Sequence, residues 1–270
     1  MLCKGMAANT QKLAAPVRRA RIREMLRENQ QVSISGLASV FGVSEMTVRR
    51  DLDTLANNGE LRRTHGGAVP AERLVLEFDF AQRRQNHRQA KMAIAVEALK
   101  LTKPGHRIIL DTGTTTLELA YLLKNSRDIT VITPSLAAAS VLQFFPGVET
   151  IILGGVMREG NPDLTGAVTE RTLDMFAADI AFLGADGIGL DGTLYTEDIR
   201  IARVDEKIRQ ISERTYVLAD SSKIARTALS TNGLLNEVDA LITDDKITDE
   251  HRQALEKTGA RLIMVSLDNS

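Results

Sequence analysis

The sequence predicts two domains: a small, mainly helical N-terminal domain, and an α/β domain whose sheet is mainly parallel. Its length of 270 residues suits one large domain or two ordinary ones. Near Pro104 and Gly105 the hydrophobic pattern changes from helical stripes to short β-rich runs that alternate with helices. The charge changes as well, because residues 1–73 carry a net charge of +5 and the remainder carries −6. A basic head on an acidic body is typical of a nucleic-acid-binding module joined to another domain.

The first predicted elements are a tail and two helices. Residues 1–17 are polar and rich in alanine, and they predict a flexible tail. An amphipathic helix follows up to Asn29, with its apolar positions on one face. Residues 32–34 predict only a short extended connection. A second helix then stops at Gly42, a residue that can adopt the left-handed turn conformation.

A third helix and a hairpin complete the N-terminal domain, which we place at residues 18–70. Ser44 is a favourable N-cap for a helix over residues 45–58. One face of that helix has the spacing of a buried stripe. The stripe consists of Val48, Leu52 and Leu55. Residues 60–69 then predict a small hairpin with its turn at the glycine pair 66–67.

Residues 71–88 have no sustained period and predict a linker, which leaves residues 89–270 as the second domain. That domain begins with a helix over residues 89–101. The predicted strands are 107–110, 130–133, 150–153, 180–183, 216–219, 240–243 and 262–265. The helices predicted among them lie near 115–124, 135–144, 168–177, 198–213 and 248–258. This alternation predicts a parallel sheet with helices on both faces.

The N-terminal helices and hairpin have the layout of a winged helix-turn-helix, whose second motif helix enters the major groove of DNA. Counted at about 100° per residue, Arg50 lies opposite the buried stripe. Arg50 is therefore the best candidate for a base contact, because arginine bound to guanine is the commonest specific contact. The predicted DNA-binding residues are Ser44, Met46, Thr47, Arg49, Arg50, Arg62, Arg63 and His65.

The alternative is an ordinary three-helix subdomain with a solvated basic face. A single basic helix would favour that alternative. Here a turn glycine, an N-cap serine, a buried stripe, paired arginines and a basic wing follow one another, and this order favours DNA binding. His65 on its own predicts only support of the wing or a phosphate contact.

Two segments carry a family resemblance. Residues 43–52 (VSEMTVRRDL) and 61–68 (LRRTHGGA) closely resemble the signature of the DeoR family of bacterial sugar-responsive transcriptional regulators. The likeness covers about residues 18–265. The resemblance implies a winged helix-turn-helix joined to an effector domain that is similar to sugar-phosphate isomerases. It also implies repression of a carbohydrate-utilisation operon.

Residues 111–116 (DTGTTT) follow a predicted strand and open a predicted helix. Backbone N–H groups at a glycine-containing turn, the threonine hydroxyl groups and a helix N-terminus together make an anion site suited to phosphate. The turn lacks the lysine of a Walker loop. Simple helix capping explains such a turn equally well on its own.

Polar turns at other strand ends favour a ligand pocket. Segments 154–155 (GG), 184–187 (GADG) and 220–223 (DSSK) each follow a β-rich run. Each is explained locally by turn chemistry. In open α/β sheets, however, ligands bind beyond the carboxyl ends of the strands, where these groups would converge.

The family resemblance adds to this prediction. It implies that residues 111–116 hold the phosphate of the ligand and that Asp186 and Lys223 lie around the sugar, with Glu197 and Lys207 as further candidates. The complete predicted ligand set is Asp111, Thr112, Gly113, Thr114, Thr115, Thr116, Gly154, Gly155, Asp186, Glu197, Lys207, Asp220, Ser222 and Lys223. The chain departs from the pattern at Pro134, where an amide side chain is expected, and near Gly192, where the glycine-rich run of the isomerases has no counterpart.

The composition indicates which cellular compartment and which cofactors to expect. Cys3 is the single cysteine, so an internal disulfide is excluded, and the sequence has no Cys/His cluster with the spacing of a zinc site. No run approaches the roughly 18 apolar residues that a membrane-spanning helix needs. We therefore expect a cytoplasmic protein without metal or cofactor.

Two functions remain after these observations. The favoured hypothesis is a homo-oligomeric repressor that binds double-stranded operator DNA, is released by a phosphorylated sugar, and has no catalytic residues. The alternative is a sugar-phosphate isomerase-like enzyme with a DNA-binding head, since Asp186, Glu197, Lys207 and Lys223 could transfer protons.

Overall fold

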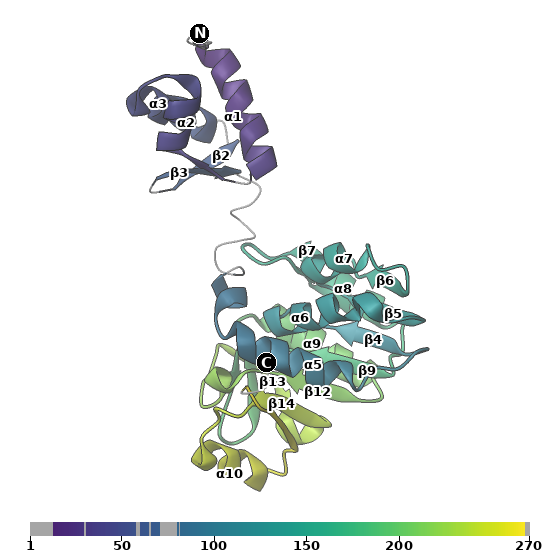
Figure 1. The fold of residues 1–270 in the computed structure, drawn as a ribbon. Coiled ribbons are helices and arrows are strands. Elements are labelled where there is room, and N and C mark those ends of the chain that lie inside the picture. Colours follow the sequence, from purple (N-terminus) through teal and green to yellow (C-terminus); the bar gives the residue numbers. More distant parts are fainter. Residues whose placement is uncertain are drawn as a thin grey trace, which may run out of the picture. The chain divides into compact units, whose positions relative to one another are not determined.

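The computed structural model describes residues 13–29, 31–57, 60–64, 66–70, 80 and 82–267. The chain divides into two compact units, residues 1–78 and 79–270 (Figure 1). The described residues of the first unit build one hydrophobic core, and those of the second build three. Separate cores are what two domains require.

The described part of the N-terminal unit consists of helices packed on a small antiparallel sheet, with strand order β1-β3-β2. The helices are α1 (Ala15–Asn29), α2 (Ile34–Phe41) and α3 (Glu45–Asn57). The strands are β1 (Val32–Ser33), β2 (Leu61–Thr64) and β3 (Gly67–Pro70). This is the predicted winged helix-turn-helix, with β2 and β3 as the wing.

The predicted tail is too long at its carboxyl end. Helix α1 begins at Ala15 rather than at residue 18. Pro16 is compatible with this start, because a proline in the first turn lacks only an N–H group that has no partner within the helix. Residues 15–17 therefore belong to the N-terminal unit.

The short segment before α2 is a strand rather than only a connection. Strand β1 pairs with β3, and Ser33 lies opposite Gly67. A Cβ atom at Gly67 would lie 1.9 Å from the carbonyl oxygen of Val32. Gly67 was predicted as a turn residue, but the close approach of two backbones is what requires glycine there.

The turn and the cap between α2 and α3 are confirmed. Gly42 has φ 61° and ψ 35°, the left-handed conformation that ends α2. The Ser44 hydroxyl accepts a hydrogen bond from the backbone N–H of Thr47 at 3.2 Å, as an N-cap does. The predicted stripe of α3 is also confirmed, because Val48, Leu52 and Leu55 are all 0% exposed.

A buried ion pair joins α1 to α3. The Arg18 Nε atom lies 2.5 Å from an Asp51 oxygen, with side-chain exposures of 8% and 7%. A second guanidinium, that of Arg19, lies 3.9 Å from the same carboxylate. Because both partners are buried, the loss of either charge leaves the other uncompensated in a poorly solvated place.

We expect Asp51→Asn to destabilise the N-terminal unit by about 3–5 kcal/mol, the usual cost of breaking a buried pair. Hydrogen exchange of α1 and α3 in the full-length protein measures this unit separately from the other. Glu24→Gln is the control, because Glu24 and its partner Arg21 are both more than half exposed. That change should cost less than about 1 kcal/mol. Unchanged protection in Asp51→Asn would refute a structural role for the pair.

The C-terminal unit is built on a seven-stranded sheet with strand order β15-β14-β12-β9-β4-β5-β6. All neighbouring strands are parallel. The strands are β4 (Arg107–Leu110), β5 (Ile129–Thr133), β6 (Val148–Ile152), β9 (Ile180–Leu183), β12 (Thr215–Leu218), β14 (Ala240–Asp244) and β15 (Leu262–Val265). Each predicted run coincides with one of them to within two residues, so the predicted α/β fold class is confirmed.

Helices cover both faces of this sheet (Figure 1). Helices α5 (Arg88–Leu99), α6 (Thr114–Leu122) and α7 (Leu136–Leu142) share one core with the strands. Helices α8 (Ala167–Leu173) and α9 (Ile199–Ile211) pack on the opposite face. Helix α10 (Asp249–Lys257) contributes Leu255 to a further core. None of the described helices is long and apolar enough to span a lipid bilayer.

Smaller elements connect the strands and helices of this sheet. The antiparallel strands β10 (Gly187–Ile188), β11 (Thr193–Thr196) and β13 (Ser230–Leu234) form one sheet, and β7 (Val156–Met157) pairs with β8 (Leu164–Thr165). Three short 3₁₀ turns are η1 (Leu123–Asn125), η2 (Ser221–Lys223) and η3 (Leu235–Glu237).

Part of the predicted linker belongs to the C-terminal unit. Residues 82–85 are helical, and Phe80 packs into the same core as α5 and α6. Lys91 on α5 donates hydrogen bonds to the carbonyl oxygens of Arg83 and Asn86, which holds this segment against the helix. The sequence pattern gave no sign of this because the segment is mostly polar.

Candidate functional site

The exposed face of α3 is the candidate DNA interface. Opposite the buried stripe, Met46 is 59% exposed, and Arg49 and Arg50 are exposed as well. Ser44 and Thr47 lie at the helix N-terminus, where their hydroxyl oxygens are 3.0 Å apart. The five predicted residues of the helix and its cap therefore lie at or next to one solvent-facing surface, where phosphate and base contacts are possible.

The two arginines of α3 differ in their partners. The Arg49 guanidinium lies 3.6 Å from the Glu45 carboxylate, one helical turn away. The side chain of Arg50 has neither an ion pair nor a hydrogen bond to any residue that the structure describes. Arg50 is thus exposed without a partner among the described residues, which suits the two-hydrogen-bond contact expected with guanine.

The wing is fastened to α3 by Arg63. Its Nη1 atom donates to the backbone oxygen of Arg49 at 3.2 Å and also pairs with Asp53. Arg63 therefore positions the wing on the helix, although we predicted a DNA contact. The side chain of Arg62 and all of His65 lie outside the described residues.

A cavity of about 520 Å³ opens at the carboxyl edge of the parallel sheet, entirely within the C-terminal unit. The chain leaves β4 toward β5 and β6, then returns to β9 on the other side of β4. The neighbours β4 and β9 therefore form a topological switch point, the place where open α/β sheets bind ligands. The loops that follow these two strands both line the cavity.

Asp111 joins the two strands of the switch point. Its Oδ2 atom accepts a hydrogen bond from the backbone N–H of Gly184 at 2.9 Å. Its Oδ1 atom is buried and has no partner among the described residues, although Asp111 lines the cavity. Burial raises the pKa of Asp111, and the Gly184 N–H opposes that shift.

The predicted phosphate turn lies at the N-terminus of α6. Gly113 is the N-cap and makes no side-chain capping bond, so the first-turn N–H groups have no side-chain cap. Residues 112–115 all line the cavity. Thr116, however, is 0% exposed, and its hydroxyl donates to the backbone oxygens of Asp111 and Gly113. The turn therefore offers an anion site at a helix N-terminus, whereas Thr116 only stabilises its shape.

Three other predicted ligand residues lie away from the cavity lining in the described part of the chain. Gly154 and Gly155 form a turn under α8, where the Thr169 hydroxyl donates to the Gly154 oxygen at 2.7 Å. Lys207 pairs instead with Asp174, the C-cap residue of α8. With Thr116, these residues are corrections to the predicted set. The two glycines follow β6, which is the edge strand of the sheet and lies two strands away from β4 of the switch point.

The structure adds cationic and polar side chains that the sequence did not single out. These cavity-lining residues are Gln82, Arg83, Asn86, His87, Lys91, Arg158, Asn161, Asp205 and Arg226. The basic run at residues 83–91 was a visible signal, but residues 83–88 fell in the predicted linker and Lys91 fell in the helix predicted over residues 89–101. Burial lowers the pKa of Lys91, the Asp220 carboxylate opposes that shift, and Lys223 reinforces it.

The predicted acidic residues at the strand ends also line the cavity. The Oδ2 atom of Asp186 accepts from the Thr196 hydroxyl at 3.1 Å and from the Glu197 backbone N–H at 3.0 Å. Asp220 caps η2 and accepts from Ser222. These hydrogen bonds fix the carboxylates at the rim of the sheet, where sugar hydroxyls could donate to them.

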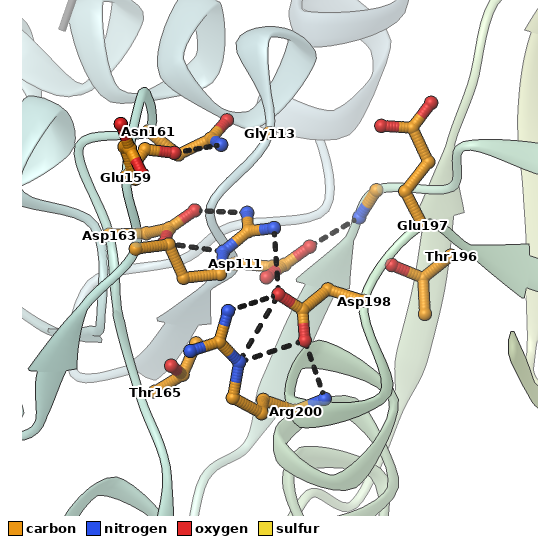
Figure 2. Close-up of polar contacts among 12 residues, drawn as sticks. Asp111, Gly113, Glu159, Asn161, Asp163, Thr165, Thr196, Glu197, Asp198 and Arg200 are labelled. Atoms are coloured by element: carbon orange, nitrogen blue, oxygen red, sulfur yellow. Dashed lines mark hydrogen bonds and ion pairs between the residues drawn. The ribbon is translucent and has the colours of Figure 1, made fainter. Parts of the chain in front are cut away.

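Arg158 is held between two carboxylates on the cavity wall. Its guanidinium donates to Asp163 at 2.8 and 2.5 Å, and it lies 3.6 Å from Asp198. Asp198 also forms an ion pair with Arg200, whose Nη2 atom lies 2.6 Å from the Asp198 Oδ2 atom. Figure 2 shows both arginines at this carboxylate. This network orders the segment beside β7 and β8 without leaving Arg158 as a free cation.

Family comparison decides what kind of protein this is. The DeoR C terminal sensor domain matches residues 86–245, and the DeoR-like helix-turn-helix domain matches residues 18–73. The chain belongs to the DeoR family. The helix-turn-helix match contains α3 and the wing, and the sensor match contains most of the cavity, although Gln82 and Arg83 precede it.

Several relatives of this DeoR chain are named as regulators. A protein of Escherichia coli O157:H7, whose name assigns it to repression of the aga operon, is 32% identical over 92% of this chain and 93% of its own length. The transcriptional repressor AccR of Agrobacterium fabrum is 34% identical over 84% of this chain and 88% of its own. The L-fucose operon activator of Haemophilus influenzae is 31% identical over 87% and 94%. The prediction of a DNA-binding transcriptional regulator rather than an enzyme is confirmed.

Proposed function

We propose that this DeoR-type regulator represses a carbohydrate-utilisation operon and that a phosphorylated sugar, bound in the cavity, releases it from operator DNA. The observation that carries the proposal is the uncapped N-terminus of α6 within a cavity that also contains unpaired cations. Lys223 and Arg226 line that cavity and make no ion pair with any described residue. Helix N–H groups and flexible cations are the usual ligands of a phosphate group.

The rest of the cavity suits a polyol. Carboxylates at the ends of β9 and β12 accept hydrogen bonds, and Asn161 and Thr196 add groups that both donate and accept. A cavity of about 520 Å³ is within the range for a small metabolite. The cavity therefore offers one site for an anion and another for hydroxyl groups.

The position of residues 82–87 supports communication between the two units. This segment lines the cavity and directly follows the residues that connect the chain to the DNA-binding unit. A ligand shifts DNA affinity only if it binds the DNA-competent and incompetent states unequally. A ligand that contacts Arg83 or His87 would stabilise one conformation of this segment directly.

Operator binding by two or more subunits completes the proposal. A single helix-turn-helix buries a small area, so regulators of this kind bind repeated half-sites as symmetric oligomers. We place this homo-oligomer in the cytoplasm, where both operator and metabolite are available.

The proposal is tested by selecting bound duplexes from a random DNA library and then measuring operator affinity with and without sugar phosphates. We expect at least one sugar phosphate to raise the melting temperature of the protein and to weaken operator binding by 5- to 150-fold, a typical allosteric coupling. A reporter gene downstream of the operator then gives the sign of control. Failure of every sugar phosphate to bind, or tighter operator binding with ligand, would refute the proposed release.

A further inference from the structure

Asp205 is a buried carboxylate that faces the ligand cavity. It lies on α9, is 1% exposed, and is one of the residues that line the cavity. Its Oδ2 atom accepts a hydrogen bond from the Asn232 amide at 2.6 Å. Its Oδ1 atom is fully buried and has no partner among the described residues. A buried polar atom without a partner is costly, so a group that lines a cavity in this state points to a ligand.

Five acidic side chains line the cavity. The acidic residues of the lining are Asp111, Asp186, Glu197, Asp205 and Asp220. None of them forms an ion pair with a cation in the part of the chain that the structure describes. Asp163 and Asp198, which do not line the cavity, do have arginine partners. The cavity therefore contains both carboxyl groups and cations that have no ion-pair partner among the described residues.

The basic side chains of α5 and its preceding segment lie on one face of the sheet, and the acidic side chain of Asp205 lies on the other. Arg83 and Lys91 lie beside or on α5, which packs on the same face as α6 and its anion site. Asp205 comes from α9, which packs on the opposite face. A ligand in this cavity therefore meets the N–H groups of α6 from one face of the sheet and a buried carboxyl group of α9 from the other.

We infer that the ligand is a phosphorylated amino sugar, whose phosphate binds at the N-terminus of α6 and whose free ammonium group is held by Asp205. This inference rests on the proposed function, because it specifies the class of sugar phosphate. An ammonium group supplies both a positive charge and N–H donors, which is what the unpartnered Oδ1 atom lacks. A metal ion would need several ligands together, and no group of three His, Cys, Asp or Glu side chains among the described residues is arranged to hold one.

The resting state of Asp205 agrees with this role. Burial raises the pKa of Asp205 well above its ordinary value, and the Asp111 carboxylate raises it further. Asn232 and the Arg209 guanidinium oppose the shift, whereas Asp186 adds to it. A ligand ammonium reverses the balance by favouring the ionised carboxylate. Asparagine has the shape of the neutral acid, so Asp205→Asn is expected to fold.

The test compares matched ligands by isothermal titration calorimetry of the full-length protein. Glucosamine 6-phosphate and galactosamine 6-phosphate are each paired with the parent hexose 6-phosphate and with the N-acetylated form, which has no ammonium group. We expect at least one free amino sugar phosphate to bind about 10-fold or more tightly than both of its partners, as a charge-assisted hydrogen bond provides. In Asp205→Asn this ratio should fall to about 1 while the parent sugar phosphate still binds.

Glu206→Gln is the matched control. Glu206 is the next residue of α9, is exposed and does not line the cavity, so this change removes the same charge and should leave the ratio unaltered. Equal affinities of the amino and parent sugar phosphates in the wild type would refute the inference while leaving the proposed function intact. A preference that persists in Asp205→Asn would refute the role of Asp205. Binding of no sugar phosphate would overturn the proposed function itself, and this inference with it.

Discussion

Arg50→Ala is expected to weaken specific operator binding by about 1–3 kcal/mol per subunit, the worth of one arginine–guanine contact. For two subunits on one operator this amounts to a loss of roughly 30-fold or more. The physical reason is that Arg50 is exposed on α3, opposite residues that are 0% exposed, and forms no side-chain contact with another described residue. Its guanidinium therefore contributes nothing visible to the fold, and ligand binding should be unchanged. Fluorescence anisotropy with the selected operator measures the effect.

Two further variants separate base recognition from charge. Arg50→Lys keeps the positive charge but loses the planar pair of donors, so it should lose specificity while keeping affinity for random duplex. Arg21→Ala removes one charge from α1 of the same unit and should change operator affinity far less. If Arg50→Ala retained wild-type operator affinity, α3 would not be the helix that reads the operator.

The fold was predictable because its signals are local. The stripe Val48, Leu52 and Leu55 predicts a buried helix face by spacing alone, and Gly42 and Ser44 mark the turn by their conformational preferences. The parallel strands are buried on both faces, so each is a short apolar run bounded by polar turns. What the sequence could not supply was pairing between distant segments, as with β1, where a two-residue strand is recognised only by its partner β3.

The site was predictable only where it coincides with strand ends. Residues 111–115, Asp186 and the 220–223 turn follow apolar runs, and all but Ser221 of these line the cavity. Asp205 and Arg83 have no such marker, because one lies within the helix α9 and the other in a polar segment before α5. Their approach to the cavity depends on how helices pack across both faces of the sheet. Conversely, Gly154 and Gly155 have the right local pattern, but they follow an edge strand rather than the switch point.

The anion site allows a sharp test in which the fold and the function respond in opposite directions. Thr114 is the first residue of α6 and lines the cavity. In Thr114→Asp the new carboxylate lies at a helix N-terminus, where it stabilises the helix by about 0.3–1 kcal/mol. The same charge meets the ligand phosphate, and two like charges about 4 Å apart repel by about 4 kcal/mol at an effective dielectric constant near 20. Sugar phosphate affinity should therefore fall by at least about 100-fold without loss of stability.

The control for this variant is Ala167→Asp. Ala167 is exposed and is the first residue of α8, which also follows an uncapped glycine, but it does not line the cavity. The Ala167→Asp variant should therefore bind the sugar phosphate with normal affinity. Thr114→Asp should still bind operator DNA, because α3 is untouched, yet sugar phosphate should no longer release it. On the same preparations, calorimetry measures sugar phosphate affinity, and fluorescence anisotropy of labelled operator measures DNA binding and release. If the sugar phosphate still released Thr114→Asp from operator DNA normally, the N-terminus of α6 would not be the phosphate site. A phosphate dianion bound there would be repelled by the new carboxylate.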